Sequence, residues 1–531
     1  MTTTAASAAS RLGTPTKPSV IAGLLATDGY KHSHRQVYPQ GTNTILINWT
    51  NRSGKLLPGA SHAVHFGLQA FLQNYLIEMW APFFAATEDE VADEFERVLL
   101  SYFGPNNIGS DHVRALHRLG YLPLHVKGLP EGTLAPFGVP TVLVENTHPE
   151  FFWLPNYIET ALSASIWHPS TTATVATIYR ELLEGWAEKT GGDLDAIDFQ
   201  AHDFSMRGQT SLESAAASGA GHLLSFLGTD SMPSLDFIDR YYPGDNGWVG
   251  ASVPATEHSV MCIRGEQGEF DTFNAILDAF PTGIVSAVAD GYDFFGVLTE
   301  ILPQLKGRIL ARDGKLVIRP DSGDPVDIMT GTYIVDDSNC ADYEAKKAAG
   351  ALTPEELGAI EILGDLFGWE LNDKNYKRLN QHIGLIYGDS ITLDRAQRTF
   401  ERLAAKGWES TSVVLGIGSF TYQYLTRDNL GSAVKATWAD VDGQSVDIQK
   451  DPKTGAGKKS AKGRLAVIRD ETGELELLQQ ATPEDEARSL IQTVWLDGEF
   501  INPVSFADVR ANLKGARADR AARADHRTES A

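Results

Sequence analysis

The chain has few cysteines, a deficit of positive charge and no long apolar segment. Only Cys262 and Cys340 occur among 531 residues, and neither belongs to a Cys-x-x-Cys pair. This scarcity argues against a disulfide framework or a thiolate zinc site and favours a reducing, cytoplasmic location. No uninterrupted apolar run is long enough to cross a bilayer, so we expect a soluble protein that does not enter membranes.

Acidic residues outnumber basic ones by 69 to 45, and the formal net charge is −24. Such a charge repels nucleic acids and acidic membrane surfaces, so we expect neither as a partner. A site for an anionic substrate must then be a local concentration of arginine, lysine and backbone N–H groups. The one dense basic run, "KDPKTGAGKKSAKGR" at 450–464, fits either a solvated hairpin loop or a loop that grips phosphate.

The length predicts two closely associated domains. Residues 1–19 are rich in Ser, Thr and Ala and lack acids, as transit peptides do, but a disordered tail is the favoured interpretation. Residues 156–190 are predicted to form a pair of helices. The expected units are an N-terminal α+β domain at 20–190, an α/β barrel at 191–430 with a peripheral helical insertion at 336–376, C-terminal strands at 431–510 that complete the β-rich domain, and a flexible tail at 511–531.

From about residue 195, short apolar runs recur, each ending in small or acidic residues and each followed by a helical pattern. This alternation indicates parallel βα units, and about six in a row predict a barrel. Ligands bind such barrels at the C-terminal ends of the strands. Taken singly, an Asp or Gly there also fits a turn or a helix N-cap, but the repetition favours a site. The residues at these ends are Arg207, Asp230, Asp290, Arg319, Asp321, Asp389 and Ser419.

Three of these strand ends predict phosphate binding. In "RPDSGDP" (319–325), Arg319 can hold phosphate oxygens in a fork, and Asp321 can face a ribose hydroxyl or a magnesium ion. "GDS" (388–390) and "GIGS" (416–419) offer open backbone N–H groups at the next two strand ends. None is a Walker loop or a dinucleotide fingerprint. Together they indicate a phosphorylated sugar as the ligand.

Two further stretches carry candidate residues. In "HDFSMRG" (202–208), the ring of Phe204 beside the cation of Arg207 suits an aromatic base on a phosphate-bearing sugar, with core packing as the alternative. In "SVPATEHSVM" (252–261), a glutamate precedes His258. Such a pair alone is more often structural than catalytic, so the role of His258 stays open at this point.

These segments, from "LLATDGYKHSHRQVYP" to "KDP…KKSAKGR", together resemble the nicotinamide phosphoribosyltransferase family over roughly residues 20–510. The resemblance implies a type II phosphoribosyltransferase fold, an α/β barrel with an attached β-rich α+β domain, and a homodimer with shared active sites. It implies synthesis of nicotinamide mononucleotide and diphosphate from nicotinamide and phosphoribosyl pyrophosphate in NAD salvage. It also implies Mg²⁺ as cofactor and ATP as a stimulatory co-substrate.

The same resemblance assigns roles. Phe204 would stack on nicotinamide opposite the partner subunit's Tyr30, and Asp230 would accept a hydrogen bond from the carboxamide and disfavour nicotinate. His258 would accept a phosphoryl group from ATP, with Glu257 either assisting or structural. His258, Asp321 and Arg319 are the candidate catalytic residues, Arg319 also contacts the base, and no residue is assigned to a metal. The diphosphate ligands would be Arg207, His258, Arg319, Arg52, Lys450 and Lys458, and the ribonucleotide ligands Asp230, Arg319, Pro320, Asp321, Gly388, Asp389, Gly418, Ser419 and Arg427.

One departure from the family and three alternatives remain. Ser419 and Phe420 in "GIGSFTY" replace expected glycines, which alters the phosphate loop, and the insertion is longer than usual. A nicotinate phosphoribosyltransferase would share the fold, but Asp230 argues against it. A catalytically silent dimeric nucleotide-binding homologue and a phosphosugar-processing barrel enzyme are the other two alternatives.

Overall fold

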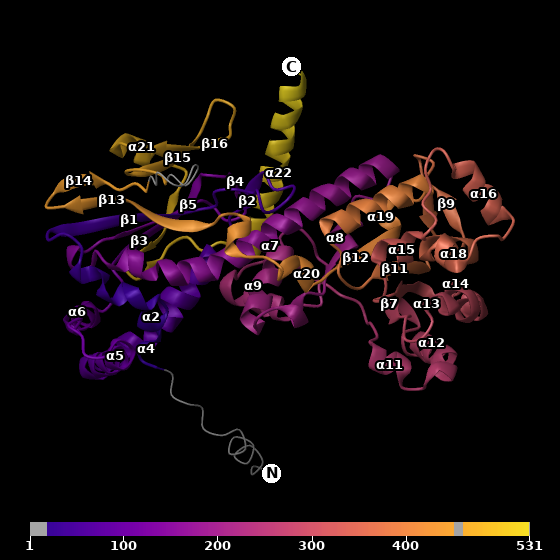
Figure 1. The fold of residues 1–531 in the computed structure, drawn as a ribbon, viewed down its shortest axis with the longest axis horizontal. Helices are drawn as coiled ribbons and strands as arrows, with labels where there is room; N and C mark the ends of the chain where they lie inside the picture. The colour runs from indigo at the N-terminus through magenta and orange to yellow at the C-terminus, as the bar shows by residue number, and fades with distance from the viewer. Residues whose placement is uncertain (1–18, 451–459, 530–531) are drawn as a thin grey trace, which may run out of the picture.

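The computed structural model describes residues 19–450 and 460–529, which form a β-rich domain and a barrel domain (Figure 1). The β-rich domain is built on an antiparallel seven-stranded sheet in the order β14–β13–β1–β5–β3–β17–β18. Strands from both ends of the chain share this sheet, because β13 pairs with β1 and β17 with β3. Its strands are β1 (Thr42–Thr50), β3 (Leu124–Gly128), β5 (Pro140–Asn146), β13 (Ala433–Val441), β14 (Gln444–Asp447), β17 (Gln492–Leu496) and β18 (Glu499–Phe500).

Helices and two small two-stranded sheets complete this domain. Apolar residues of the sheet and helices form one core that includes Trp49, Trp80 and Phe95. Thr87 and Glu90 form a capping box at the start of α5, which fixes where that helix begins. The elements are α2 (Ala22–Leu25), η1 (Gly29–Gln36), α3 (Leu68–Phe71), η2 (Leu72–Met79), α4 (Ala81–Ala85), α5 (Glu88–Phe103), α6 (Asp111–Leu119), η3 (Pro149–Phe151), α21 (Pro483–Ala487) and the two-stranded sheets β2 (His62–Val64) with β4 (Leu134–Pro136) and β15 (Leu465–Arg469) with β16 (Leu475–Gln479).

One helix, α7 (Leu154–Thr190), joins the two domains and contacts elements of both (Figure 1). The prediction of two helices over 156–190 is wrong, because α7 continues through Pro169, a residue type that usually breaks a helix. Neighbouring side chains hold the backbone there. Ser170 Oγ donates to the carbonyl of Val64 (2.5 Å) and Thr171 Oγ1 to that of Trp167 (2.6 Å). Tertiary contacts therefore sustain the helix where its local sequence would end it.

The barrel domain contains five parallel strands in the order β6–β12–β11–β8–β7, which confirms the predicted α/β fold. Isolated parallel bridges continue this sheet from β6 back to β7 through residues 228–229 and 251–255. The apolar run at 222–231 therefore supplies bridges and no full strand. The elements are α8 (Ile197–Gln200), β6 (Ala201–Asp203), η4 (Met206–Gly208), α9 (Leu212–His222), α10 (Pro233–Tyr241), α11 (His258–Cys262), η5 (Glu266–Gly268), α12 (Glu269–Ala279), β7 (Thr282–Val288), α13 (Phe294–Gly296), η6 (Val297–Ile301), α14 (Leu302–Leu310), β8 (Asp313–Arg319), α15 (Pro325–Thr330), β11 (Ile383–Tyr387), α19 (Leu393–Ala405), η7 (Ser410–Ser412), β12 (Val413–Ile417), α20 (Ser419–Tyr422) and η8 (Arg427–Asn429).

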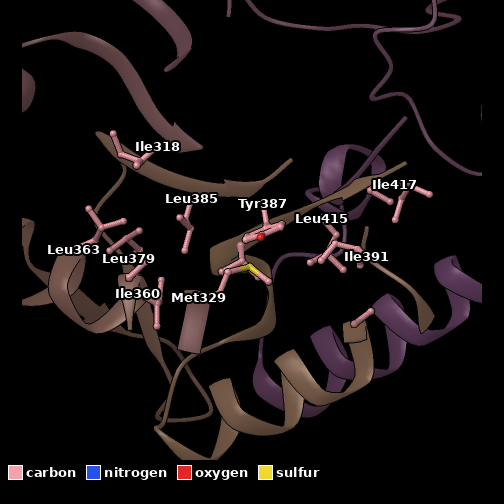
Figure 2. Packing of buried hydrophobic residues seen from close by; sticks show 14 of the residues in the cluster. Ile318, Met329, Ile360, Leu363, Leu379, Leu385, Tyr387, Ile391, Leu415 and Ile417 are labelled. Carbon is pink, nitrogen blue, oxygen red and sulfur yellow. The ribbon is translucent and has the colours of Figure 1, made fainter. Parts of the chain in front are cut away.

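The insertion between β8 and β11 is part of the barrel core and is not peripheral. Figure 2 shows Ile360 and Leu363 of α18 in the same apolar cluster as Leu385 of β11. Glu361, fully buried, accepts hydrogen bonds from Lys377 Nζ (2.8 Å) and from an indole N–H. The insertion comprises α16 (Cys340–Ala348), α17 (Pro354–Leu357), α18 (Ala359–Phe367) and the hairpin β9 (Trp369–Leu371) with β10 (Lys377–Leu379).

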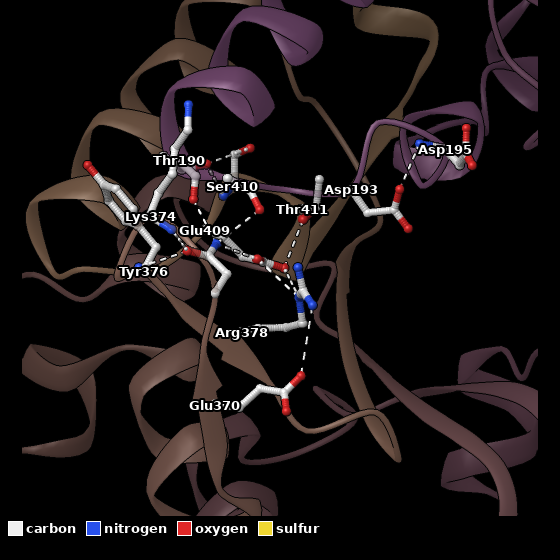
Figure 3. A network of polar contacts seen from close by, with 12 residues as sticks. Thr190, Asp193, Asp195, Glu370, Lys374, Tyr376, Arg378, Glu409, Ser410 and Thr411 are labelled. Atoms are coloured by element: carbon white, nitrogen blue, oxygen red, sulfur yellow. Dashed lines mark hydrogen bonds and ion pairs between the residues drawn. The ribbon is translucent and has the colours of Figure 1, made fainter.

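A polar network ties the β9–β10 hairpin to the end of α7 (Figure 3). Glu409 accepts hydrogen bonds from Asn372 Nδ2 (2.9 Å), Arg378 Nε (3.1 Å) and Thr411 Oγ1 (2.9 Å). Asn372 Nδ2 also donates to the carbonyl of Thr190 (2.8 Å). Because these residues precede β12, the network lies at the amino end of the strands and serves the stability of the barrel.

The C-terminal segment differs from the predicted flexible tail at 511–531, because α22 (Phe506–Glu529) extends through most of it. Val509 and Leu513 are buried against the barrel helices. Arg510 donates to the carbonyl of Leu223 at the end of α9 (2.7 Å), and Arg517 pairs with Glu184 of α7. An Ala/Arg-rich sequence is only weakly helical alone, so these contacts with distant residues stabilise the helix.

Glu131, in the loop after β3, is a buried junction between the two domains. Its carboxylate accepts from the backbone N–H of Gln69 (2.7 Å) and the hydroxyl of Tyr242 (2.7 Å). We expect Glu131→Ala to lower the free energy of unfolding by about 3 kcal/mol, because both buried donors lose their acceptor. Glu131→Gln keeps an acceptor oxygen and should lose less. Urea titrations of the three proteins test this, and an alanine variant with the wild-type midpoint would contradict it.

Candidate active site

The carboxyl ends of the barrel strands meet at one edge of the sheet, because the strands are parallel. Phe204 directly follows β6, Arg319 ends β8, and Gly388 and Gly418 follow β11 and β12. Apolar residues dominate β11 and β12, and a small residue marks where the chain leaves the core after each. Nine of the predicted site residues follow these ends or the bridging segments, namely Phe204, Arg207, Asp230, Arg319, Asp321, Gly388, Asp389, Gly418 and Ser419.

Arg319 is the central cation of this edge. Its Nε and Nη2 donate to the two carboxylate oxygens of Asp321, each at 3.0 Å, so the pair forms a two-bond fork. Its guanidinium carbon lies 4.7 Å from the ring centroid of Phe204. An aromatic face, a cation and a carboxylate thus meet here, as an aromatic base attached to a ribose phosphate requires.

Asp230 lies on the neighbouring segment and has two donors. His202 Nε2 is 3.0 Å and Ser252 Oγ 2.5 Å from its Oδ1. Burial raises the pKa of the Asp230 carboxyl, but the hydrogen bonds from His202 and Ser252 and the charge of Arg319 outweigh burial and hold the pKa below its usual range. Asp230 is therefore an ionised carboxylate at neutral pH.

His258 is the first residue of α11 and its side chain is half exposed. Its Nε2 lies 3.2 Å from Asp290 Oδ1, and Asp290 Oδ2 accepts the backbone N–H of Asp321 (3.0 Å). Asp290 thus connects His258 to the strand that carries the Arg319 fork. Glu257 instead accepts a hydrogen bond from the hydroxyl of Ser259, which supports a structural role for Glu257.

Sequence reasoning gave no role to Asp290 or His202, although both contact assigned residues. Asp290 follows β7 in "VADGYD", so its place at a strand end is predictable, but its contact with His258 is not. His202 and Phe204 are two positions apart in an extended segment, and that spacing puts side chains on one face. The centroids of the two rings are 4.5 Å apart. This spacing is the signal that could have identified His202.

Two glycines leave room for the fork and for Asp389. A Cβ at Gly388 would overlap Asp321 Oδ1 and lie 2.5 Å from Arg319 Nε, whereas one at Gly418 would lie 2.8 Å from Asp389 Oδ1. Pro320 contributes its carbonyl, which accepts the N–H of Gly388 (3.1 Å). Small residues therefore let neighbouring strand ends approach each other.

The loop that departs from the family begins at Ser419. Its side chain packs against Gly208 of η4, where a Cβ would overlap the Ser419 hydroxyl. Phe420 stacks on Tyr424, with ring centroids 5.4 Å apart and planes 9° from parallel. Arg207, next to Gly208, is exposed. Ser419 thus packs α20 against η4, whereas Phe420 packs against the residues that follow α20.

Two further predicted cations, Arg52 and Lys450, lie on the β-rich domain. Arg52 and Lys450 line a cleft of about 370 Å³ together with Lys435 of β13. Burial lowers the pKa of the Lys435 amine, the charge of Glu159 raises it, and the charges of Arg52, Lys450 and Arg427 lower it further. Predicted residue Lys458 lies outside the described residues.

Tyr30 also belongs to the β-rich domain, within η1, and 59% of its surface is exposed. Its hydroxyl donates to Asp28 Oδ2 (3.2 Å). The ring of Phe204 contacts His202 and Arg319 of the barrel domain, and among the described residues no ring contact joins it to Tyr30.

Three further observations concern the described part of the chain outside these site residues. In the part of the chain that the structure describes, no helix has the length and apolarity to span a membrane. Among the same residues, no three His, Cys, Asp or Glu side chains are grouped as ligands for a metal ion. A larger cleft of about 810 Å³ lies between α7, α9 and α10, and none of the predicted site residues lines it.

The barrel strand ends carry a guanidinium fork, an aromatic face and small loop residues. This arrangement is typical of an enzyme that binds a phosphorylated sugar and an aromatic ring. The sequence model of the nicotinate phosphoribosyltransferase (NAPRTase) family matches residues 199–498, which contain this site. The chain therefore belongs to the nicotinate phosphoribosyltransferase family.

Curated relatives are similar over nearly the whole chain. A protein of Acinetobacter baylyi named nicotinamide phosphoribosyltransferase is 43% identical over 503 residues, 92% of this chain and 96% of the relative. One of the same name from Xanthomonas campestris is 32% identical over 504 residues, 93% and 98% of the two chains. Human nicotinic acid phosphoribosyltransferase shares the fold, with a TM-score of 0.53, 16% identity and coverage of 93% and 94%.

Proposed function

We propose that this protein is a nicotinamide phosphoribosyltransferase, which forms nicotinamide mononucleotide and diphosphate from nicotinamide and phosphoribosyl pyrophosphate. The observation that carries the proposal is the ionised Asp230 beside the Arg319–Phe204 pair. A carboxylate there accepts a hydrogen bond from a neutral carboxamide and repels the carboxylate of nicotinate. The names of the curated relatives support the same base.

The reaction needs alignment and charge neutralisation more than proton transfer. Diphosphate leaves the anomeric carbon, and the pyridine nitrogen attacks the oxocarbenium-like ribose with inversion. Because that nitrogen already has a free electron pair, no general base is required. Phe204 orients the ring, Asp321 lies where a ribose hydroxyl can bind, and Arg319 and Arg207 stabilise the charge that develops on diphosphate.

The test is product formation by the wild-type protein with each base. We expect kcat/KM for nicotinamide to exceed that for nicotinate by at least about a hundredfold, because a site built to hydrogen-bond one substituent discriminates strongly against a ligand that cannot form that bond. A preference for nicotinate would favour the other activity of the family. Substrate binding without any product would favour a catalytically silent homologue.

We also propose that His258 accepts a phosphoryl group from ATP. A carboxylate only accepts hydrogen bonds, so Nε2 carries the proton that faces Asp290. In the neutral imidazole the free electron pair is then on Nδ1, which can attack the γ-phosphorus while ADP leaves. The half-exposed side chain is accessible to such a nucleotide.

For His258→Ala we expect basal transfer to persist while stimulation by ATP disappears, because the phosphoryl acceptor is gone. Initial rates with and without ATP measure this. Ser259→Ala is the matched control, because it changes the next residue of α11 and should keep the stimulation. Stimulation of wild-type size in His258→Ala would refute the assignment.

Magnesium is proposed as the cofactor. Burial raises the pKa of the Tyr387 phenol, and the charges of Asp290, Asp321 and Asp389 raise it further, so several carboxylates face this region. Mg²⁺ commonly binds through one or two carboxylates plus substrate phosphate oxygens, which fits Asp321 and Asp389. The ion would neutralise the departing diphosphate when bound.

A homodimer and a cytoplasmic location complete the proposal. Exposed Tyr30 and the cleft lined by Arg52 and Lys450 belong to the β-rich domain and not to the barrel loops, as expected of groups that serve a partner subunit's site. In that arrangement the partner subunit's Tyr30 covers the nicotinamide ring and its cations bind phosphate. Both cysteines are free thiols, which fits a reducing compartment.

A further inference from the structure

His202 has two contacts that relate it to the base. Its Nε2 lies 3.0 Å from Asp230 Oδ1, and its ring lies 4.5 Å from that of Phe204 with 34° between the planes. The side chain is only 12% exposed. His202 therefore contacts both the residue that would stack on the ring and the residue that would select its substituent.

The hydrogen bonds around Asp230 divide its two oxygens. Because a carboxylate is an acceptor, His202 Nε2–H and Ser252 Oγ–H both donate to Oδ1. Oδ2 has no hydrogen-bond partner among the described residues, and 41% of the side chain is exposed. Two donors on one oxygen fix the rotation of the carboxylate and leave Oδ2 available for a ligand.

The position of the imidazole is itself constrained. A Cβ at Gly228 would lie 2.9 Å from His202 Nδ1, closer than packed atoms tolerate. Gly228 belongs to the segment that leads directly to Asp230, and it forms a parallel bridge with Ala251, the residue before Ser252. The ring thus contacts Phe204 on its own segment and Gly228 on the next.

We infer that His202 is a specificity-determining positioning residue, which holds Asp230 so that Oδ2 receives the carboxamide N–H of the base. This inference rests on the proposed function. A fixed acceptor binds an amide strongly and meets a carboxylate with full charge repulsion. If the donor from His202 is lost, only Ser252 holds Oδ1 and the carboxylate can rotate, which weakens amide binding more than it weakens catalysis of the transfer.

Two substitutions separate the hydrogen bond from the packing. His202→Phe keeps an aromatic ring beside Phe204 but has no donor, whereas His202→Gln keeps an N–H donor and loses the ring. The measured quantities are kcat/KM for nicotinamide and nicotinate and KM for each substrate. We expect His202→Phe to lower the ratio of kcat/KM for nicotinamide to kcat/KM for nicotinate by about tenfold or more. One hydrogen bond to a charged group has an effect of this size.

The same variant should raise KM for nicotinamide and leave KM for phosphoribosyl pyrophosphate unchanged, which a general structural defect would not do. His202→Gln should stay within about threefold of the wild-type preference. Gly228→Ala, which displaces the imidazole without removing it, should shift the preference in the direction of His202→Phe. It provides the measurement if His202→Phe does not fold.

The outcomes distinguish the inference from the function on which it rests. A wild-type protein that does not prefer nicotinamide refutes the proposed function. A wild-type protein that does prefer it, together with a folded His202→Phe of unchanged preference, refutes the role of His202. Rescue by phenylalanine and not by glutamine would likewise refute it, because packing would then be the requirement.

Discussion

Replacing Arg319 by lysine should lower kcat/KM for nicotinamide mononucleotide formation by about 10²–10³-fold, although the charge is conserved. Removal of one preorganised donor from an active site causes a loss of this size. The guanidinium donates to both oxygens of Asp321 and its carbon lies 4.7 Å from the centroid of Phe204. A lysine amine is a point charge, and it cannot make the fork and cover the ring at the same time.

Arg402→Lys is the matched control for this substitution. Arg402 of α19 is as buried as Arg319, with 15% and 17% of the side chains exposed, and it also pairs with an aspartate, Asp327. It follows no strand end, so we expect activity within about threefold of wild type, as for most substitutions away from a site. If both lysine variants lose activity equally, the fork has no special role in the reaction.

The effect should appear in both steady-state parameters. Loss of ring contact raises KM for nicotinamide, whereas loss of the oriented charge at diphosphate departure lowers kcat. Steady-state kinetics with each substrate varied in turn separates them. A variant with raised KM and unchanged kcat would limit Arg319 to binding.

The barrel strands were predictable because strands buried on both faces consist of short, nearly continuous apolar runs. The runs at β11 and β12 are of this kind, whereas β7 and β8 are buried only in part. A polar or small residue at or just after each strand end predicts its place at the carboxyl edge. The helix α22 was not predictable from its Ala/Arg-rich segment. Its stability depends on contacts such as Arg510 with the carbonyl of Leu223, 287 positions away in sequence.

The candidate site shows the same division. The place of Asp230 and Asp290 at strand ends follows from local pattern, but their partners do not. His202 reaches Asp230 across 28 positions and His258 reaches Asp290 across 32. Which strand ends become neighbours depends on barrel closure through single bridges at residues 228–229 and 251–255. No local pattern encodes those bridges.

The second large effect is expected from one methyl group. Gly388→Ala should lower kcat/KM by about a hundredfold or more, because a displacement of the reacting groups by about 1 Å costs that much. Its Cβ would overlap Asp321 Oδ1 and lie 2.5 Å from Arg319 Nε, so the fork must open. The backbone angle of Gly388 is not in the left-handed region, so alanine adds no conformational strain there.

Gly384→Ala isolates the cause, because it adds the same methyl group within β11, the strand that Gly388 directly follows. Its Cβ would meet only side-chain atoms, Lys315 Cδ at 3.1 Å and Val317 Cγ2 at 3.2 Å, which can give way by a few tenths of an ångström. We expect near wild-type kcat/KM for Gly384→Ala and similar melting temperatures for both variants. Equal activity losses would mean that β11 tolerates no added volume anywhere. A loss confined to Gly388→Ala would mean that the reaction requires the two-bond contact between Arg319 and Asp321, since that contact is what the added methyl group displaces.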